Sequence, residues 1–193
     1  MAELMLIVLA AALVNNFVLV QFLGVCPFMG ASSRVENAIG MGLATGLVLA
    51  TAAGLTQLLD RYLLRPFELE HLRLITFILV IGAAVHLTEL ALRRFSPLLH
   101  RVLGLFVPLV ASNCAVLGVA LLNATASRSF VATLFYGAGA ALGFGLALAL
   151  FAGLRERLAY ADVPVAFRGA SIAFVTAGIL SLAFMGFAGF ARL

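Results

Sequence analysis

Charge is what this sequence lacks most. Only 10% of its 193 residues are charged, whereas a typical soluble domain carries about 25% and a surface that faces water needs roughly 25–35%. The scarcity excludes most classes of soluble protein. It also excludes a disordered chain, which combines high charge with low hydrophobicity, because 64% of these residues are hydrophobic and the mean hydropathy is +1.18. The composition therefore predicts a protein that lies in a lipid bilayer.

Lysine is absent, and all twelve basic residues are arginines scattered among apolar runs. Nucleic-acid binding requires a basic stripe on one face, so we expect no nucleic-acid partner. A signal peptide begins with a basic segment, whereas this chain carries Glu3 there. We therefore expect the first apolar run to remain as a membrane span. The sequence contains no nucleotide-binding loop, nucleophile elbow or His-Glu zinc motif, and we predict no catalytic residue.

The charged residues divide the chain into six apolar segments. A transmembrane helix needs about 20 apolar residues, and each segment meets or nearly meets this length. The strands of a membrane barrel would alternate apolar and polar residues, whereas these segments are apolar throughout. The sequence therefore predicts a single all-α integral membrane domain over residues 1–193, with six transmembrane helices at residues 4–33, 37–59, 74–92, 102–127, 129–154 and 169–191.

Six spans place both chain ends on the same side of the membrane. Five arginines then lie on that side and seven on the other, and the side richer in arginine is the cytoplasmic one. We therefore expect both termini on the outer, periplasmic side. The arginines predicted to be cytoplasmic are Arg34, Arg93, Arg94, Arg101, Arg155, Arg157 and Arg168.

The two halves of the chain align when one is shifted by 97 positions, which predicts an internal repeat of roughly residues 1–96 and 97–193. Because each half holds three spans, the second half would be inverted relative to the first. The shift places Asn16 on Asn113, Gly42 and Gly46 on Gly139 and Gly143, and Phe77 on Phe174.

Spans one and four carry the signals of a broken helix. Proline and glycine free backbone groups that in lipid must be satisfied inside the protein, and inverted repeats often build a site from such breaks. The alternative is a pair of ordinary kinked helices with polar packing contacts. The signals are Asn15, Asn16, Gln21, Gly24 and Pro27 in the first span, and Pro108, Ser112, Asn113 and Gly118 in the fourth.

Cys26 and Cys114 are the only cysteines, and each lies in one of the two broken spans. One interpretation is that they are small buried apolar residues. The other is metal ligation: an iron–sulfur cluster usually takes four thiolates, so two would be half a site and another chain would supply the rest. Backbone N–H groups freed by the breaks would then donate hydrogen bonds to the sulfurs and tune the reduction potential.

Two further groups of polar residues stand out. His86 and Glu89 are three positions apart and therefore share a helix face; they could bind a proton or cation, or form an ordinary pair near the membrane boundary. Arg155-Glu156-Arg157 and the segment from Asp162 to Gly169 are expected to form a polar connector that anchors helix ends or docks neighbours.

Several segments resemble one family of membrane subunits, and together they cover essentially the whole chain. They are Val14–Gly30, Ile39–Thr45, Ser112–Asn123, Arg155–Arg157, Asp162–Pro164 and Phe167–Ile172. The chain resembles the RnfA/NqrE family, whose members belong to the Rnf ion-translocating electron transport complex and to the Na⁺-translocating NADH:quinone reductase. The pairs Asn15-Asn16 and Cys26-Pro27 resemble the Rnf branch more closely. An inverted-repeat transporter without a redox role is the alternative that the residues leave open.

The resemblance implies a subunit of a translocase in the bacterial inner membrane that couples electron transfer between NADH and ferredoxin to Na⁺ or H⁺ translocation. It implies that Cys26 and Cys114 bind iron of an intramembrane [2Fe–2S] cluster. A sister subunit of opposite topology, RnfE, would contribute the other half of the ligands, and the remaining Rnf subunits B, C, D and G would be further partners. The chain would relay electrons without catalysis of its own.

Overall fold

The computed structural model describes residues 2–64, 66, 70–95, 110, 113–126, 129–164 and 167–190. Every secondary-structure element in these ranges is helical, which confirms the predicted all-α class. In chain order the elements are α1 (Ala2–Leu9), the π-helical turn η1 (Ala10–Val14), α2 (Phe17–Gln21), α3 (Val25–Ala31), α4 (Val35–Leu59), the π-helical turn η2 (Asp60–Leu64), the 3₁₀ turn η3 (Glu70–Leu72), α5 (Arg73–Phe95), α8 (Cys114–Thr125), α9 (Phe130–Ala159) and α10 (Ala170–Phe190).

Three helices of the described chain are long and apolar enough to cross a membrane, at Val35–Leu64, Arg73–Leu90 and Phe130–Ala159. Shorter apolar helices cover Leu4–Val14, Cys114–Thr125 and Ala170–Gly186, within the other three predicted spans. Much of span four, including Pro108, lies outside the described residues. The structure thus contains several candidate membrane helices, and the count of six spans stays a prediction.

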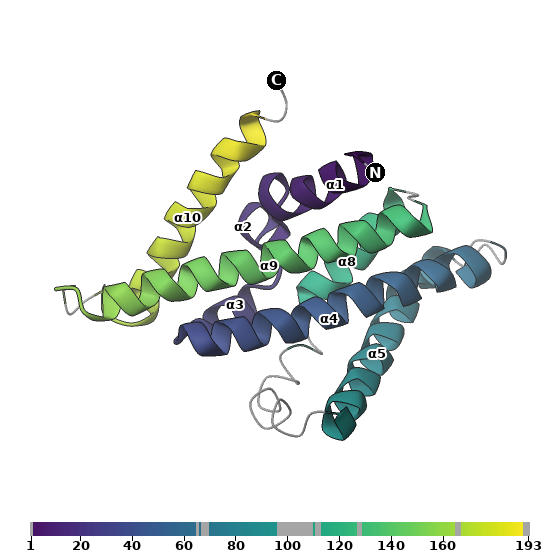
Figure 1. The fold of residues 1–193 in the computed structure, drawn as a ribbon, viewed down its shortest axis with the longest axis horizontal. Helices are drawn as coiled ribbons and strands as arrows, with labels where there is room; N and C mark the ends of the chain where they lie inside the picture. The colour runs from purple at the N-terminus through teal and green to yellow at the C-terminus, as the bar shows by residue number, and fades with distance from the viewer. Residues whose placement is uncertain are drawn as a thin grey trace.

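Helices α4 and α9 form the centre of the molecule and run antiparallel, side by side (Figure 1). They approach closely because small residues line their contact: a Cβ atom on Gly42 would lie 3.2 Å from the Gly145 Cα, and one on Gly46 would lie 3.3 Å from the Ala141 Cβ. Close approach through small residues is how helices pack in lipid, where the hydrophobic effect does not drive them together. Gly42 and Gly46, two landmarks of the predicted repeat, therefore build the central contact.

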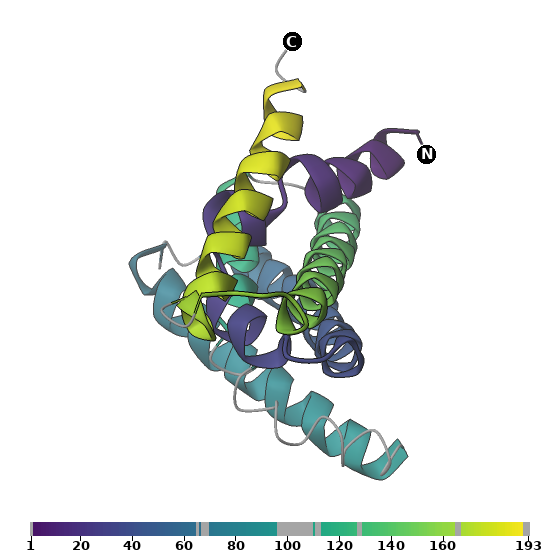
Figure 2. The ribbon, with the colours of Figure 1, turned by 90° about the vertical axis from the view of Figure 1, so that its left-hand side faces the viewer.

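The remaining helices pack around this pair so that elements of the first half of the chain contact α9 and elements of the second half contact α4. Helix α1 and turn η1 contact α9, whereas α8 contacts α4. Helix α5 packs on α4 and α8, whereas α10 packs on η1 and α2, so α5 and α10 lie on opposite sides of the central pair (Figures 1 and 2). Helix α5 begins at residue 73 and α10 at residue 170, which is the offset of the predicted repeat. The inversion of the second half stays a prediction.

The polar connector before the last span begins later than predicted. Helix α9 continues to Ala159, so Arg155, Glu156 and Arg157 lie in its final turns and not in the connector. The expected role as an anchor is confirmed. Glu156 Oε1 accepts the Val35 N–H at 3.0 Å and thereby satisfies a free backbone donor in the first turn of α4. This contact brings the start of α4 and the end of α9 to one end of the molecule.

A buried ion pair holds the opposite end of α4. Asp60, in η2, is 1% exposed, and its Oδ1 accepts a hydrogen bond from Arg73 Nε at 3.0 Å. Arg73 is the first residue of α5 and is 18% exposed. Because the two charges come from consecutive helices, the pair fixes the turn between α4 and α5.

We expect Asp60→Asn to destabilise the protein by about 2 kcal/mol. Loss of one partner of a buried pair costs ~3–5 kcal/mol, and the partial exposure of Arg73 reduces that cost. Thermal unfolding of the purified protein measures the effect. Asp162→Asn is the matched control, because Asp162 is exposed and surface changes stay within about 0.5 kcal/mol. The double variant Asp60→Asn/Arg73→Gln should regain part of the loss; equal stability of the Asp60 and Asp162 variants would contradict the prediction.

Candidate metal centre at the two thiols

The first predicted break in span one lies at Asn15 and Asn16, where the chain leaves the helix after η1. Asn16 has an extended backbone (φ −63°, ψ 106°) and caps α2, since its Oδ1 accepts the Val18 N–H at 3.1 Å. Its Nδ2 donates to the carbonyl oxygens of Ala12, at 3.0 Å, and Gly143, at 2.8 Å. The fully buried Asn16 side chain therefore satisfies the backbone groups that the break frees, as lipid requires.

The second break lies between α2 and α3. Phe22 has φ +55° and Gly24 has φ +82°, so two left-handed residues reverse the chain. Glycine is needed at position 24 for space as well as conformation. A Cβ atom there would lie 3.0 Å from the Ala115 Cβ and 3.1 Å from Asn113 Oδ1. The turn before α3 therefore packs closely against the start of α8.

Helix α8 begins at a cap equivalent to that of α2. Asn113 has an extended backbone (φ −75°, ψ 110°), and its Oδ1 accepts the Ala115 N–H at 3.0 Å. Asn16 and Asn113, which the predicted repeat aligns, thus perform the same task. Cys114 is the first residue of α8, in the first turn, where backbone N–H groups have no acceptor within the helix.

The turn before α3 contacts the thiol of Cys114. The Gly24 N–H donates a hydrogen bond to Cys114 Sγ at 3.0 Å, across 90 positions of sequence, and Cys26 follows Gly24 by two residues. Both cysteines are free thiols and both are exposed, so neither is the buried apolar residue that the sequence left open. The predicted hydrogen bond from a freed backbone N–H to sulfur is present in the Gly24–Cys114 contact.

Asn113 contributes a second donor beside Cys114. Its side chain is 4% exposed, and its Nδ2 has no hydrogen-bond partner in the described part of the chain. Leaving a buried donor unsatisfied costs about 1–3 kcal/mol, and such a group is satisfied when an acceptor binds next to it. The predictions from sequence included Asn113 as a break signal and did not identify this free donor.

The other predicted site residues do not join the thiols. His86 Nδ1 lies 3.8 Å from Glu89 Oε2 on α5, and the His86 side chain is 74% exposed. Within the described residues no three His, Cys, Asp or Glu side chains gather in a way that could hold a metal ion. The assignment of Cys26 and Cys114 as iron ligands stays a prediction, and two thiolates would be half of the four that an iron–sulfur cluster usually takes.

Comparison with known proteins identifies the family of the chain. The model of a family described as "Rnf-Nqr subunit, membrane protein" matches residues 4–191. The chain belongs to the Rnf-Nqr family. Its membership, together with the long apolar helices, identifies a multi-pass membrane protein and confirms the resemblance drawn from the cysteine motifs.

Curated relatives of this Rnf-Nqr protein match it from end to end. A protein of Alcanivorax borkumensis is 60% identical over 194 residues, and one of Pseudomonas aeruginosa is 60% identical over 193 residues. A protein of Aliivibrio fischeri is 56% identical over 193 residues. Each match covers 100% of both chains, and each relative is named as the A component of an "Ion-translocating oxidoreductase complex".

Proposed function

We propose that this chain relays electrons across the membrane through a [2Fe–2S] cluster that it shares with a second membrane subunit. The observation that carries the proposal is the Gly24–Cys114 hydrogen bond, because Gly24 is two residues from Cys26 and the bond therefore links the two segments that carry the thiols. The complex would couple electron transfer between NADH and ferredoxin to translocation of Na⁺ or H⁺, in line with the names of the relatives. The six-span, inverted arrangement with periplasmic termini in the bacterial inner membrane belongs to the same proposal.

The chemistry of the donors fits this group. Cys26 and Cys114 would supply two thiolates, and the Gly24 N–H already donates to one of them. The unpartnered Nδ2 of Asn113 would supply a second donor to sulfur. When bound, a [2Fe–2S] cluster accepts one electron and passes it on.

The exposure of the thiols supports a shared site. A metal centre inside lipid has to be enclosed, because its charge and polar groups find no water there. Cys26 and Cys114 are both exposed in this chain, so the surface of a second subunit would cover them and contribute the other two ligands. We assign that role to RnfE, with subunits B, C, D and G completing the complex.

A position of the thiols near the middle of the membrane would explain the need for a relay. The hydrocarbon core of a bilayer is about 30 Å thick, which is too far for one efficient electron transfer. Thiols held near its middle would divide the path into two steps of roughly 15 Å. In this arrangement the chain positions the carrier and performs no hydride chemistry.

Iron and acid-labile sulfide analysis with electron paramagnetic resonance tests the proposal. The chain would be purified alone and after co-expression with its membrane partner. We expect no cluster in the first sample and two irons per pair in the second. A full cluster on the chain alone, or iron-free pairs prepared without oxygen, would refute the shared site. The subunits that purify with the chain distinguish the Rnf complex from the quinone reductase.

We expect Asn113→Ser to lower the reduction potential of the complex. Reduction adds a negative charge, and a nearby hydrogen-bond donor stabilises that charge. Serine removes the amide donor of Asn113 but keeps a side-chain oxygen that can cap α8. A hydrogen bond to a charged group is worth about 1.5–3 kcal/mol, and about 59 mV corresponds to 1.4 kcal/mol for one electron, so the potential should fall by roughly 60–130 mV. A redox titration monitored by electron paramagnetic resonance measures it.

Asn16→Ser is the matched control, because both donors of Asn16 are already bonded to Ala12 and Gly143. That variant should lose thermal stability and keep its potential. Equal potentials in the two variants would show that the Asn113 amide does not reach the sulfurs.

A further inference from the structure

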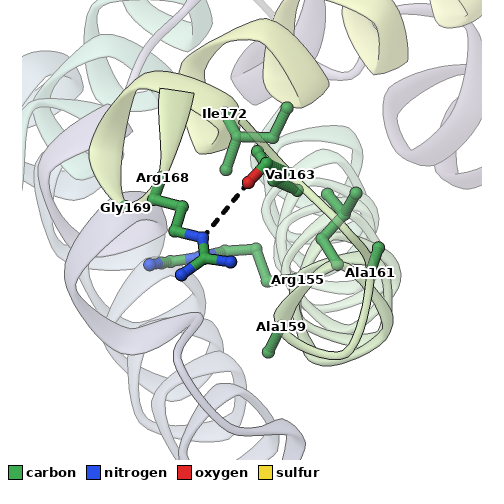
Figure 3. A pocket seen from close by; sticks show the side chains of 8 residues that line it. Arg155, Ala159, Ala161, Val163, Arg168, Gly169 and Ile172 are labelled. Carbon is green, nitrogen blue, oxygen red and sulfur yellow. Dashed lines mark hydrogen bonds between the residues drawn. The ribbon is translucent and has the colours of Figure 1, made fainter. Parts of the chain in front are cut away.

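A pocket of about 400 Å³ lies at the end of α9, between that helix, the connector and the start of α10. Arg155 and Arg168 line it together with Leu158, Val163 and Ile172. Figure 3 shows both arginine side chains reaching into the space between these elements. Two segments that resemble the family and that the electron relay does not use, 155–157 and 167–172, therefore meet in one cavity.

The two guanidinium groups are held in place by the protein. Arg155 Nη1 donates to the Met29 carbonyl oxygen at 2.9 Å and to Ser32 Oγ at 2.7 Å, and its guanidinium lies 5.9 Å from the Phe151 ring centroid. Arg168 Nε donates to the Val163 carbonyl oxygen at 3.1 Å (Figure 3). Because a guanidinium carries five N–H donors, each arginine keeps several for a ligand.

Arg155 and Arg168 bring positive charge to the pocket, and the acid of the connector, Asp162, is exposed. None of its lining residues is Asp or Glu, and neither arginine forms an ion pair within the described chain. The nearest carboxylate in sequence, Glu156, is bound to the Val35 N–H. Two arginines bind phosphate well, because each planar guanidinium can donate two parallel hydrogen bonds to phosphate oxygens. We therefore infer that the ligand carries a phosphate group.

The surroundings select the phosphate of a lipid. The pocket lies at the end of a helix that is long and apolar enough to span the membrane, where the headgroups of a bilayer would be. A second hollow of about 440 Å³ runs along α9 and is lined by Leu146, Leu150, Leu154 and Arg157 among others. That hollow lies on roughly the opposite face of α9 from the arginines, so the apolar contacts for a lipid in the first pocket come from Leu158, Val163 and Ile172.

We propose that Arg155 and Arg168 bind the phosphate of an anionic phospholipid whose apolar part contacts Leu158, Val163 and Ile172. Basic pockets between membrane helices are known to hold acidic headgroups. Neither cysteine lines this pocket, and the bound lipid would fasten the connector and the start of α10 to the end of α9. The inference is independent of the electron relay.

The test counts lipids that stay with the purified complex. Complexes carrying wild type, Arg168→Gln or Arg34→Gln would be reconstituted with mixtures of phosphatidylglycerol and phosphatidylcholine, washed in detergent and analysed by mass spectrometry. Arg34 is the matched control, because it is exposed and caps α4 at the same end of the molecule. We expect Arg168→Gln to retain about tenfold less phosphatidylglycerol, with wild type and Arg34→Gln equal.

Two further experiments distinguish lipid phosphate from free phosphate and test whether the Arg168 variant is folded. Arg168→Lys keeps the charge and should restore part of the retention if Arg168→Gln is folded. Inorganic phosphate at millimolar concentration should not displace the lipid, because it lacks the acyl chain. Equal retention of phosphatidylcholine, full displacement by inorganic phosphate, or unchanged retention in Arg168→Gln would each overturn the proposal.

Discussion

Replacing Cys114 with serine should abolish the iron–sulfur signal of the complex while the chain stays folded. The thiolate is the ligand that iron–sulfur clusters take, and a serine hydroxyl remains protonated and does not replace it. Because Cys114 is exposed, its substitution removes little packing, and serine keeps an acceptor for the Gly24 N–H. Cys26→Ser should have the same effect. Electron paramagnetic resonance, iron content and electron flow from NADH to ferredoxin are the measurements.

Val25→Ala is the control for the cysteine variants. Val25 is partly exposed, precedes Cys26 in the first turn of α3 and carries no ligand atom, so its substitution should leave signal and electron flow intact. Loss of the signal in both cysteine variants, with normal assembly, is the result that the relay requires. Full electron flow in either variant would favour a transporter without a redox role or a scaffold.

The sequence predicts the breaks in span one because breaking a helix in lipid demands particular residues. An interrupted helix exposes backbone groups that only polar side chains or special backbone conformations can satisfy. Asn16 and Gly24 are such residues, and the structure places them at the two breaks. Asn113 follows the same rule at α8. The positions of these breaks were therefore readable from local chemistry alone.

The packing of the helices was not readable in the same way. In a soluble helix the apolar face marks the core, whereas in lipid the outer face is equally apolar. On α4 the exposed Leu43 and Leu47 alternate with the buried Gly42 and Thr45, so hydrophobicity does not identify the inner face. The Gly24–Cys114 contact spans 90 positions and depends on which helices are neighbours. The sequence offers Gly24 and Cys114 as separate signals, and only the three-dimensional arrangement brings these two residues into contact.

The left-handed Phe22 is a further feature that no residue pattern indicated. A residue with a bulky side chain rarely adopts positive φ, and the sequence Gln21-Phe22-Leu23 contains no turn residue before Gly24. Phe22 ends α2, and its N–H bonds to the Phe17 carbonyl oxygen. Its side chain is 56% exposed, at the turn that leads to Cys26. The backbone bond to Phe17 accompanies this conformation, and no residue pattern in the sequence predicts it.

Replacing Gly139 with leucine should prevent α1 and η1 from packing on α9, and with it the assembly of the site. A Cβ atom at position 139 would lie 2.8 Å from the Val8 carbonyl oxygen and 2.9 Å from the Val8 Cα. Because these are backbone atoms, no side-chain rotation relieves the clash. Overpacking by a methylene alone costs about 1–3 kcal/mol, and a leucine adds a further branched group.

Gly153→Leu is the matched control on the same helix, since a Cβ atom there would meet nothing within 4 Å. Glycine in a helix costs about 0.5–1 kcal/mol relative to alanine, so this control should be as stable as the wild type or more so. Thermal unfolding and iron content report the comparison. Displacement of η1 would move Asn16 and the turn at Gly24, so Gly139→Leu should lose the cluster as well as stability. A Gly139 variant that matches Gly153→Leu in both measurements would show that α1 does not lie against α9 in the membrane.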